Sequence, residues 1–168
     1  MDILEVIRSR RSIRRYTQDP ISEEDINKIL EAARWAPSAN NSQPWEFIVL
    51  RGQEAKKKLA NMLTWGKFLS EAAVGIAVII DETASNHAVE DGAAATENIL
   101  LEAHSLGLGA CWIGTYGSVH EAKAKKALNV PNDKRLLSVV AIGYPAEAPR
   151  KTRKSLETMV FTDEYGKM

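Results

Sequence analysis

The feature that most constrains the fold is the segment from Val74 to Ile80, in which every residue is apolar or glycine. A run of this length that is rich in β-branched residues is typical of a strand buried in a protein core. It is far shorter than the roughly 18 apolar residues that a membrane-spanning helix needs, and no other stretch of the chain approaches that length. We therefore expect a protein that is built around a buried strand and does not enter a membrane.

Further strands and several helices are predicted on either side of this segment. Trp45 to Leu50 and Leu136 to Ile142 are rich in aromatic or β-branched residues, so both are expected to be strands. Ser22 precedes an acidic triplet and an apolar stripe, as in a capping box at the start of a helix. Small residues at helical spacing, ended by Gly107, predict a central helix packed closely on something flat. The expected helices are 3–7, 23–36, 53–63, 93–106 and 118–128.

Composition narrows the functional class. The 168 residues fit one domain, 1–168, and the 22 basic and 22 acidic residues cancel, which argues against a surface for nucleic acid or anionic lipid. The single cysteine, Cys111, cannot form an internal disulfide, and the first residues lack the apolar run of a signal peptide. We expect a cytoplasmic protein.

Two basic clusters are candidate phosphate sites. The first contains Arg10, Arg11, Ser12 and Arg14 at the end of the first helix, and the second runs from Pro149 to Lys154 beyond the last strand. Guanidinium groups match phosphate oxygens in a bidentate geometry and stay charged at any working pH. Solvated surface charge is the alternative for both clusters, and the residues themselves leave this choice open.

The connection from Ala36 to Trp45 is a candidate ligand cradle. It concentrates small polar side chains between two prolines that fix the path of the chain. An ordinary helix-to-strand loop is the alternative, and these residues alone favour neither interpretation over the other.

The glycine-spaced segment from Gly107 to Gly114 is not a dinucleotide-binding fingerprint, because its spacing differs and it follows a helix rather than a strand. Its glycines would let the backbone approach a flat ring, with Trp112 and Ile113 either against that ring or in the core. Cys111 has no histidine beside it in sequence, so it is not expected to be a nucleophile. The histidines are His87, His104 and His120. They are widely spaced in the sequence and have no Cys or carboxylate neighbours in a ligand pattern, so the sequence gives no support for a metal site.

The last residues include Met159, Val160 and Phe161, which a tail this short cannot bury by itself. We expect the tail to lie on a partner subunit.

Taken in order along the chain, five motifs resemble the nitroreductase superfamily in its short, single-domain form. The resemblance covers nearly the whole sequence. The motifs are Arg10 to Arg14; Ala36 to Ser38 with Asn41 and Gln43 to Trp45; Asp91-Gly92; Leu106 to Gly109 with Trp112 to Gly114; and Ile142 to Pro145 with Lys151 and Arg153.

This resemblance implies an α+β fold with a central, mostly antiparallel sheet flanked by helices. It also implies an obligate homodimer that exchanges its C-terminal tail, about 150–168, and binds FMN at the interface. Arg10, Ser12, Lys151 and Arg153 would hold the phosphate and ribityl chain, with Arg14 near the pyrimidine end. The partner would supply Pro37, Ser38, Ala39 and Asn41, and the backbone of Ile113 and Gly114 would face the ring near N5. Arg11 and Trp112 complete the expected cofactor-binding set.

By the same resemblance, NADH or NADPH would reduce the flavin, which would then reduce nitroaromatics or quinones by a ping-pong mechanism. No catalytic side chain is expected, because flavin carries the electron chemistry. The alternatives are other flavin reactions of the superfamily, namely reductive dehalogenation or flavin fragmentation, and a non-enzymatic FMN-binding protein. The chain lacks the long middle insertion of larger members. Trp65, Gly66, Lys67 and Phe68 occupy the nearest equivalent stretch, where they either border the open face of the flavin or pack on the surface.

Overall fold

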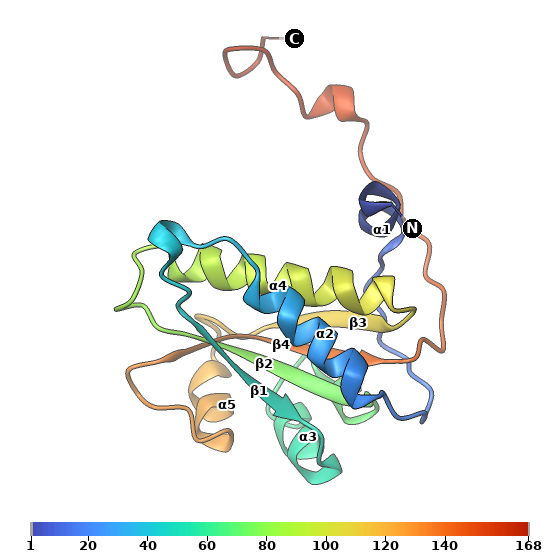
Figure 1. Ribbon diagram of the computed structural model, residues 1–168, viewed down its shortest axis with the longest axis vertical. Coiled ribbons are helices and arrows are strands. Elements are labelled where there is room, and N and C mark those ends of the chain that lie inside the picture. The colour runs from blue at the N-terminus through green and yellow to red at the C-terminus, as the bar shows by residue number, and fades with distance from the viewer. Residues whose placement is uncertain (1, 168) are drawn as a thin grey trace.

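The computed structural model describes residues 2–167, so the two terminal residues of the predicted domain 1–168 lie outside the described residues. Its centre is a four-stranded antiparallel sheet with the strand order β1-β2-β4-β3 (Figure 1). The strands are β1 (Trp45–Leu50), β2 (Val74–Ile80), β3 (Gly109–Gly114) and β4 (Arg135–Gly143). The α-helices are α1 (Ile3–Ser9), α2 (Glu23–Arg34), α3 (Gln53–Ala60), α4 (Ala88–Ser105) and α5 (Glu121–Ala127). Short 3₁₀ helices are η1 (Ala39–Asn41), η2 (Lys67–Ser70) and η3 (Leu156–Thr158).

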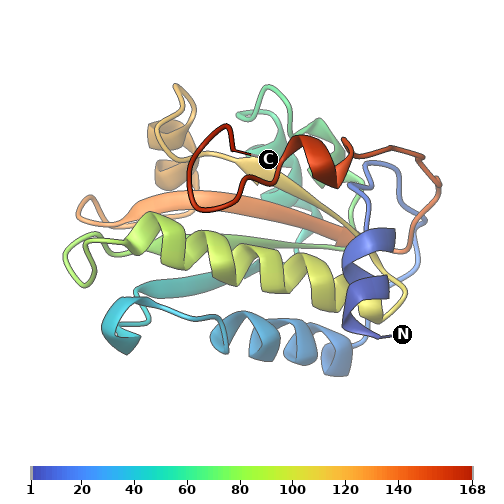
Figure 2. The same ribbon diagram turned by 90° about the horizontal axis from the view of Figure 1, so that it is seen from above.

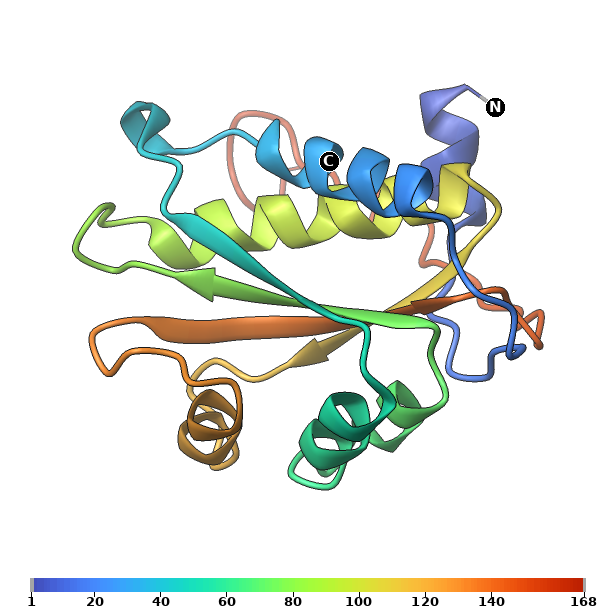
Figure 3. The same cartoon turned by 60° about the horizontal axis from the view of Figure 1, so that its bottom comes forward.

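Helices cover both faces of the sheet. Figure 3 shows α2 and α4 on one face, with α3, η2 and α5 on the other. Since side chains alternate along a strand, β2 contributes Ile76 and Val78 to the core beneath α4, and Ala77 and Ile79 to the opposite core. All seven residues of β2 are buried. The uninterrupted apolar run that predicted this strand is therefore explained by burial on both faces.

The central helix packs closely on the sheet, as predicted. A Cβ atom at Gly92 of α4 would lie 2.6 Å from the Ile80 side chain and 2.7 Å from that of Leu137. The Thr96 hydroxyl lies 3.0 Å from that of Ser138 on β4. Gly107, at a φ of 78°, follows the helix in the left-handed region that favours glycine, so its predicted role as the helix end is confirmed.

The helix boundaries and one strand differ from the sequence-based expectations. Gly109–Gly114, which had no predicted secondary structure, forms β3 and pairs with β4, because a short glycine-containing edge strand has no clear periodicity. The expected helix 118–128 begins only at Glu121, since Gly117 and the residues after it form a turn. The second and third helices end early, at Arg34 and Ala60.

The two ends of the chain leave apolar side chains exposed. Helix α1 buries Val6 but exposes Ile3, Leu4 and Ile7. The tail after β4 runs away from the sheet, alongside α1 and beyond it (Figures 1 and 2). Its apolar side chains are exposed over half of their surface or more at Leu156, Met159, Val160 and Tyr165. Within the described part of the chain, no helix has both the length and the apolar character of a membrane-spanning segment.

Candidate active site

The first basic cluster is fixed to the edge of the sheet by Ile13. The Ile13 amide donates to the Ala110 carbonyl of β3 at 3.0 Å, and Ser12 forms a parallel bridge with the same residue. The Ile13 side chain is buried, and a Cβ atom at Gly109 would lie only 2.8 Å from it. Gly109 therefore admits Ile13 against the strand, whereas the sequence suggested that this glycine admits a flat ring.

Gly109→Val should destabilise the protein by about 1–3 kcal/mol, because the added side chain would overpack against Ile13. Denaturant unfolding measures the loss. Gly114→Ala on the same strand is the control, with every protein measured after removal of FMN, since a Cβ atom there meets no atom of the described chain within 4 Å. If the two variants unfold at the same denaturant concentration, the proposed role of Gly109 is wrong.

A cavity of about 740 Å³ opens beside this cluster. Its walls come from β3, from the connection between α3 and η2, and from the turn before α5. Its cations are Arg14 and Lys67, its histidine is His120, and no carboxylate among the described residues lines it. The Arg14 guanidinium lies 5.9 Å from the centre of the Phe68 ring. The residues that line the cavity are Arg14, Leu63, Thr64, Trp65, Lys67, Phe68, Cys111, Trp112, Ile113, Gly114, Ser118, Val119 and His120.

Several predicted site residues meet in this cavity. Arg14 joins Trp112, Ile113 and Gly114, and the middle segment contributes Trp65, Lys67 and Phe68. Leu63, Thr64, Ser118, Val119 and His120 were not anticipated. The last three were expected within a helix, and Gly117, at a φ of 66°, was the available signal for a turn there.

Arg11 joins the two basic clusters through the backbone. Its guanidinium donates to the carbonyls of Arg8 at 2.7 Å and Arg10 at 2.8 Å, and reaches that of Lys151 at 3.4 Å. The Arg11 Nε atom is buried, and no residue from 2 to 167 is its hydrogen-bond partner. The second cluster thus begins next to the first, while the side chains of Lys151 and Arg153 are exposed.

The first cluster also makes its surroundings electropositive. His104, near the end of α4, shares a hydrogen bond of 2.7 Å with the Ser9 hydroxyl. Burial lowers the pKa of His104, and the charges of Arg10 and Arg11 lower it further. Arg10 has one acidic neighbour, Glu97, at 3.9 Å.

The predicted cradle lies apart from the cavity. Figure 3 shows η1 on the side of the sheet that carries α2 and α4, and Pro37, Ser38, Ala39 and Asn41 do not line the cavity in the same chain. Buried Asp91 accepts the Ala39 amide at 3.0 Å and anchors the loop. Three non-glycine residues of the loop have positive φ angles: Asn40 (53°), Asn41 (55°) and Gln43 (48°). This backbone is therefore strongly specified rather than a loose connection.

As far as the structure describes the chain, neither the cysteine nor the possible metal ligands form a reactive site. Cys111 is buried, and burial raises the pKa of its thiol, which disfavours the reactive thiolate. Between residues 2 and 167, no three His, Cys, Asp or Glu side chains are grouped as a metal site would need.

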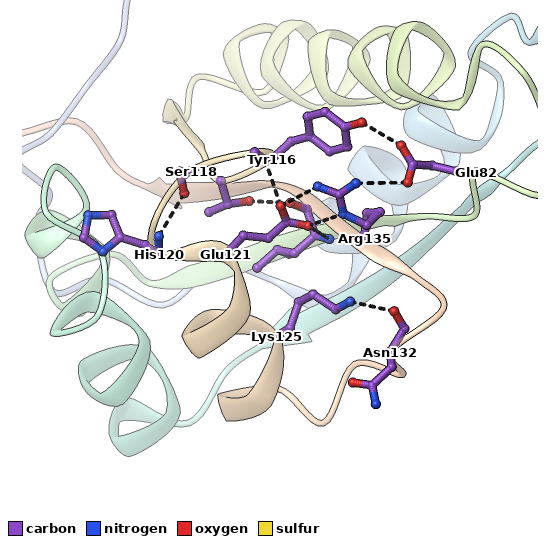
Figure 4. Close-up of polar contacts among 11 residues, drawn as sticks. Glu82, Tyr116, Ser118, His120, Glu121, Lys125, Asn132 and Arg135 are labelled. Carbon is purple, nitrogen blue, oxygen red and sulfur yellow. Dashed lines mark hydrogen bonds and ion pairs between the residues drawn. The ribbon is translucent and has the colours of Figure 1, made fainter.

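An ion pair with a buried carboxylate holds the turn that forms one wall of the cavity (Figure 4). Glu121 accepts hydrogen bonds from the Arg135 guanidinium at 2.7 and 2.8 Å and from the Gly117 amide at 2.8 Å. Arg135 also pairs with Glu82 at 3.0 Å and lies 4.3 Å from the Tyr116 ring centre. Burial alone would raise the pKa of Glu121, but the hydrogen bonds from Arg135 and Gly117 outweigh it, so this pKa is lowered.

A larger cavity, of about 840 Å³, lies on the other side of this turn. Three of its four charged lining residues are already engaged, because Arg135 and Glu121 bind each other and the Lys125 ammonium reaches the Asn132 carbonyl at 3.2 Å; the fourth is Lys126. The predicted cofactor-binding residues do not line it. The smaller, cationic cavity is thus the better candidate for a reactive ligand.

Comparison with known proteins gives one consistent result. The sequence pattern that defines the nitroreductase family matches residues 7–67 and 60–144. A protein of Archaeoglobus fulgidus, provisionally named NADH dehydrogenase/NAD(P)H nitroreductase, is 45% identical over 151 residues, which cover 87% of each chain. An FMN-dependent nitroreductase from Clostridium difficile superposes with a TM-score of 0.92 at 30% identity, covering 96% of this chain and 99% of its own. A provisionally named nitroreductase from Desulfovibrio desulfuricans, solved with FMN, superposes with a TM-score of 0.87 at 34% identity and 98% coverage of both chains. The expected fold class, an antiparallel sheet flanked by helices, is confirmed, and this chain belongs to the nitroreductase family.

Proposed function

We propose that this chain is an FMN-dependent oxidoreductase that uses NADH or NADPH to reduce small electron-poor acceptors such as quinones or nitroaromatics. The observation that carries the proposal is the cationic cavity, in which Arg14 and Lys67 accompany the open backbone of Gly114 and no carboxylate is present. The FMN and NAD(P)H in the names of its relatives support the choice of cofactor and donor.

The residues present fit FMN. A cavity of about 740 Å³ is in the usual range for a cofactor site. Gly114 has no atom within 4 Å of where a Cβ would stand, so a planar ring can approach its backbone closely.

We assign the phosphate end of the cofactor to the two basic clusters. Arg10 and Ser12 lie beside β3, and the backbone contact between Arg11 and Lys151 brings the second cluster next to them. Lys151 and Arg153 keep exposed side chains that are free to turn toward a dianion.

We further propose that the protein works as a homodimer. The exposed apolar residues of α1 and of the tail need a covering surface, and a second copy of this chain provides one. The same arrangement explains the strained loop, because Pro37, Ser38, Ala39 and Asn41 would complete the site of the partner rather than that of their own chain.

Bound FMN would supply the two-electron carrier between donor and acceptor. The chain's own residues would orient the ligands, and the fixed positive charge of Arg14 and Lys67 in the cavity would favour the negative charge that reduction adds. For a quinone, the net reaction transfers a hydride from NAD(P)H and one proton from solvent, giving NAD(P)⁺ and the hydroquinone. No side chain is assigned as proton donor. Donor and acceptor use the same cavity in turn, which gives ping-pong kinetics.

The test begins with an absorbance spectrum of the purified protein, followed by anaerobic titration with NADH and NADPH. We expect a flavin band that one or both nicotinamides bleach and that menadione restores. Flavin that no nicotinamide reduces would favour a non-enzymatic FMN-binding protein. A colourless protein that FMN cannot reconstitute would contradict the proposal.

A further inference from the structure

Two exposed apolar side chains line the cationic cavity, and neither has been given a role in the proposed reaction. Trp65 is 85% exposed and Val119 is 87% exposed, although both line the cavity. Trp65 lies between α3 and η2, and Val119 lies in the turn before α5. Large apolar side chains at such exposure within a binding cavity are the usual anchors for an apolar ligand.

A hydrogen bond holds these two residues on one rim. The Thr64 hydroxyl and His120 Nε2 lie 2.5 Å apart, and they are the immediate neighbours of Trp65 and Val119. The bond therefore ties the two segments together beside the exposed side chains. Figure 4 shows the His120 ring pointing away from the Glu121–Arg135 cluster, which places the ring on the cavity side of the turn.

The ion pair below the turn fixes Val119 from its other side. Glu121 binds the Gly117 amide at 2.8 Å, and the Thr115 and Tyr116 amides both donate to the Leu137 carbonyl at 3.1 Å. The turn is thus anchored to β4 immediately before Val119. Because both neighbours of the rim are anchored, the backbone at Trp65 and Val119 is held beside the cavity, and a ligand has only to order the two side chains.

The lining chemistry identifies the class of ligand. An indole ring favours stacking against another planar ring, and the neighbouring Arg14 and Lys67 disfavour a cation. We propose that Trp65 and Val119 form the acceptor-recognition rim of this protein and select planar aromatic acceptors, such as quinones, over acceptors that lack a ring. This inference rests on the proposed function, since it names how the same cavity chooses its oxidising substrate.

The experiment measures binding and turnover separately. Menadione is titrated into the oxidised, FMN-loaded protein without any nicotinamide, so that only binding is observed, by calorimetry. Trp65→Ala should weaken menadione binding about tenfold and Val119→Ala about threefold, from lost stacking and lost apolar contact. Trp65→Phe keeps a ring and should recover most of the loss. In steady-state assays, the ratio of kcat/KM for menadione to that for ferricyanide, which has no ring to stack, should fall in parallel.

Trp35→Ala is the matched control. Trp35 is also a highly exposed tryptophan, at 72%, but it lies at the end of α2, away from the cavity. It should leave menadione binding and the kcat/KM ratio unchanged. FMN content and the oligomeric state are measured for every variant.

Unchanged menadione binding in Trp65→Ala and Val119→Ala, with FMN retained, would overturn the inference while leaving the proposed function intact. Loss of FMN or of the dimer in Trp65→Ala would also overturn it, because the side chain would then contact the cofactor or the second subunit. Absence of FMN from the unmodified protein would instead be a failure of the proposed function.

Discussion

Glu121→Ala is expected to destabilise the protein by about 1.5–3 kcal/mol, the usual contribution of hydrogen bonds to a charged group. The carboxylate is 8% exposed and binds Arg135, while the alanine variant leaves the largely buried guanidinium with Glu82 alone. The amides of Gly117 and Leu136 also lose their acceptor. Denaturant unfolding at pH 7 measures the change in free energy.

Glu82→Ala is the control for this variant. Glu82 binds the same arginine, but its side chain is 41% exposed, so water can replace it and the loss should stay below about 1 kcal/mol. If the two variants lose equal stability, the buried position of Glu121 does not determine the strength of the cluster.

The same pair predicts a dependence on pH. Since the folded pKa of Glu121 lies below its ordinary value of about 4.3, ionised Glu121 stabilises the fold above that value, and the contribution is lost as pH falls through the folded pKa. The stability gap between the unmodified protein and Glu121→Gln should therefore be constant near neutrality and shrink below about pH 4. A gap that stays constant through this acidic range would contradict the lowered pKa.

Arg14→Ala is expected to lower the two-electron potential of bound FMN by about 30 mV, which corresponds to roughly 1.4 kcal/mol of lost preference for the reduced form. Arg14 is the arginine that lines the cavity. A cation there favours the negative charge that reduction adds to the flavin. The potential is measured anaerobically against a reference dye. The oligomeric state is measured alongside, so that a change in potential is assigned to the charge only where the assembly is unchanged.

Arg15→Ala is the matched control, since Arg15 is the next residue and is also exposed but does not line the cavity. Its potential should equal that of the unmodified protein. An unchanged potential in Arg14→Ala would show that this guanidinium is not near the ring.

The elements that could be predicted from sequence are those whose signals are local. Ser22 caps α2 as expected, with its hydroxyl accepting the Asp25 amide at 3.0 Å. The run at Val74–Ile80 predicted β2 at both of its boundaries, because burial on both faces leaves an unbroken apolar pattern. In contrast, β3 is a strand only because β4 and Ile13 pair with it, and neither contact has a local signature.

The residues of the candidate site also fall into those with a local sequence signal and those without one. The arginine cluster and Ile113-Gly114 could be identified from their motifs, and the structure brings Arg14 to the same cavity. Thr64 and His120 are 56 residues apart, so their hydrogen bond depends on how two loops meet and could not be read from either segment. The roles given to Pro37, Ser38, Ala39 and Asn41 require a second chain and stay predictions.

The position of β2 between β1 and β4 predicts two rates of amide hydrogen exchange within the sheet. Both of its edges are hydrogen-bonded and both of its faces are covered, so its amide hydrogens reach water only when the whole domain opens. Strand β3 lies at the end of the sheet, and its outer edge is paired at Ala110 by Ser12 and Ile13. We therefore expect the amide hydrogens of the wall that faces the cavity to exchange with solvent before those of the core that supports it.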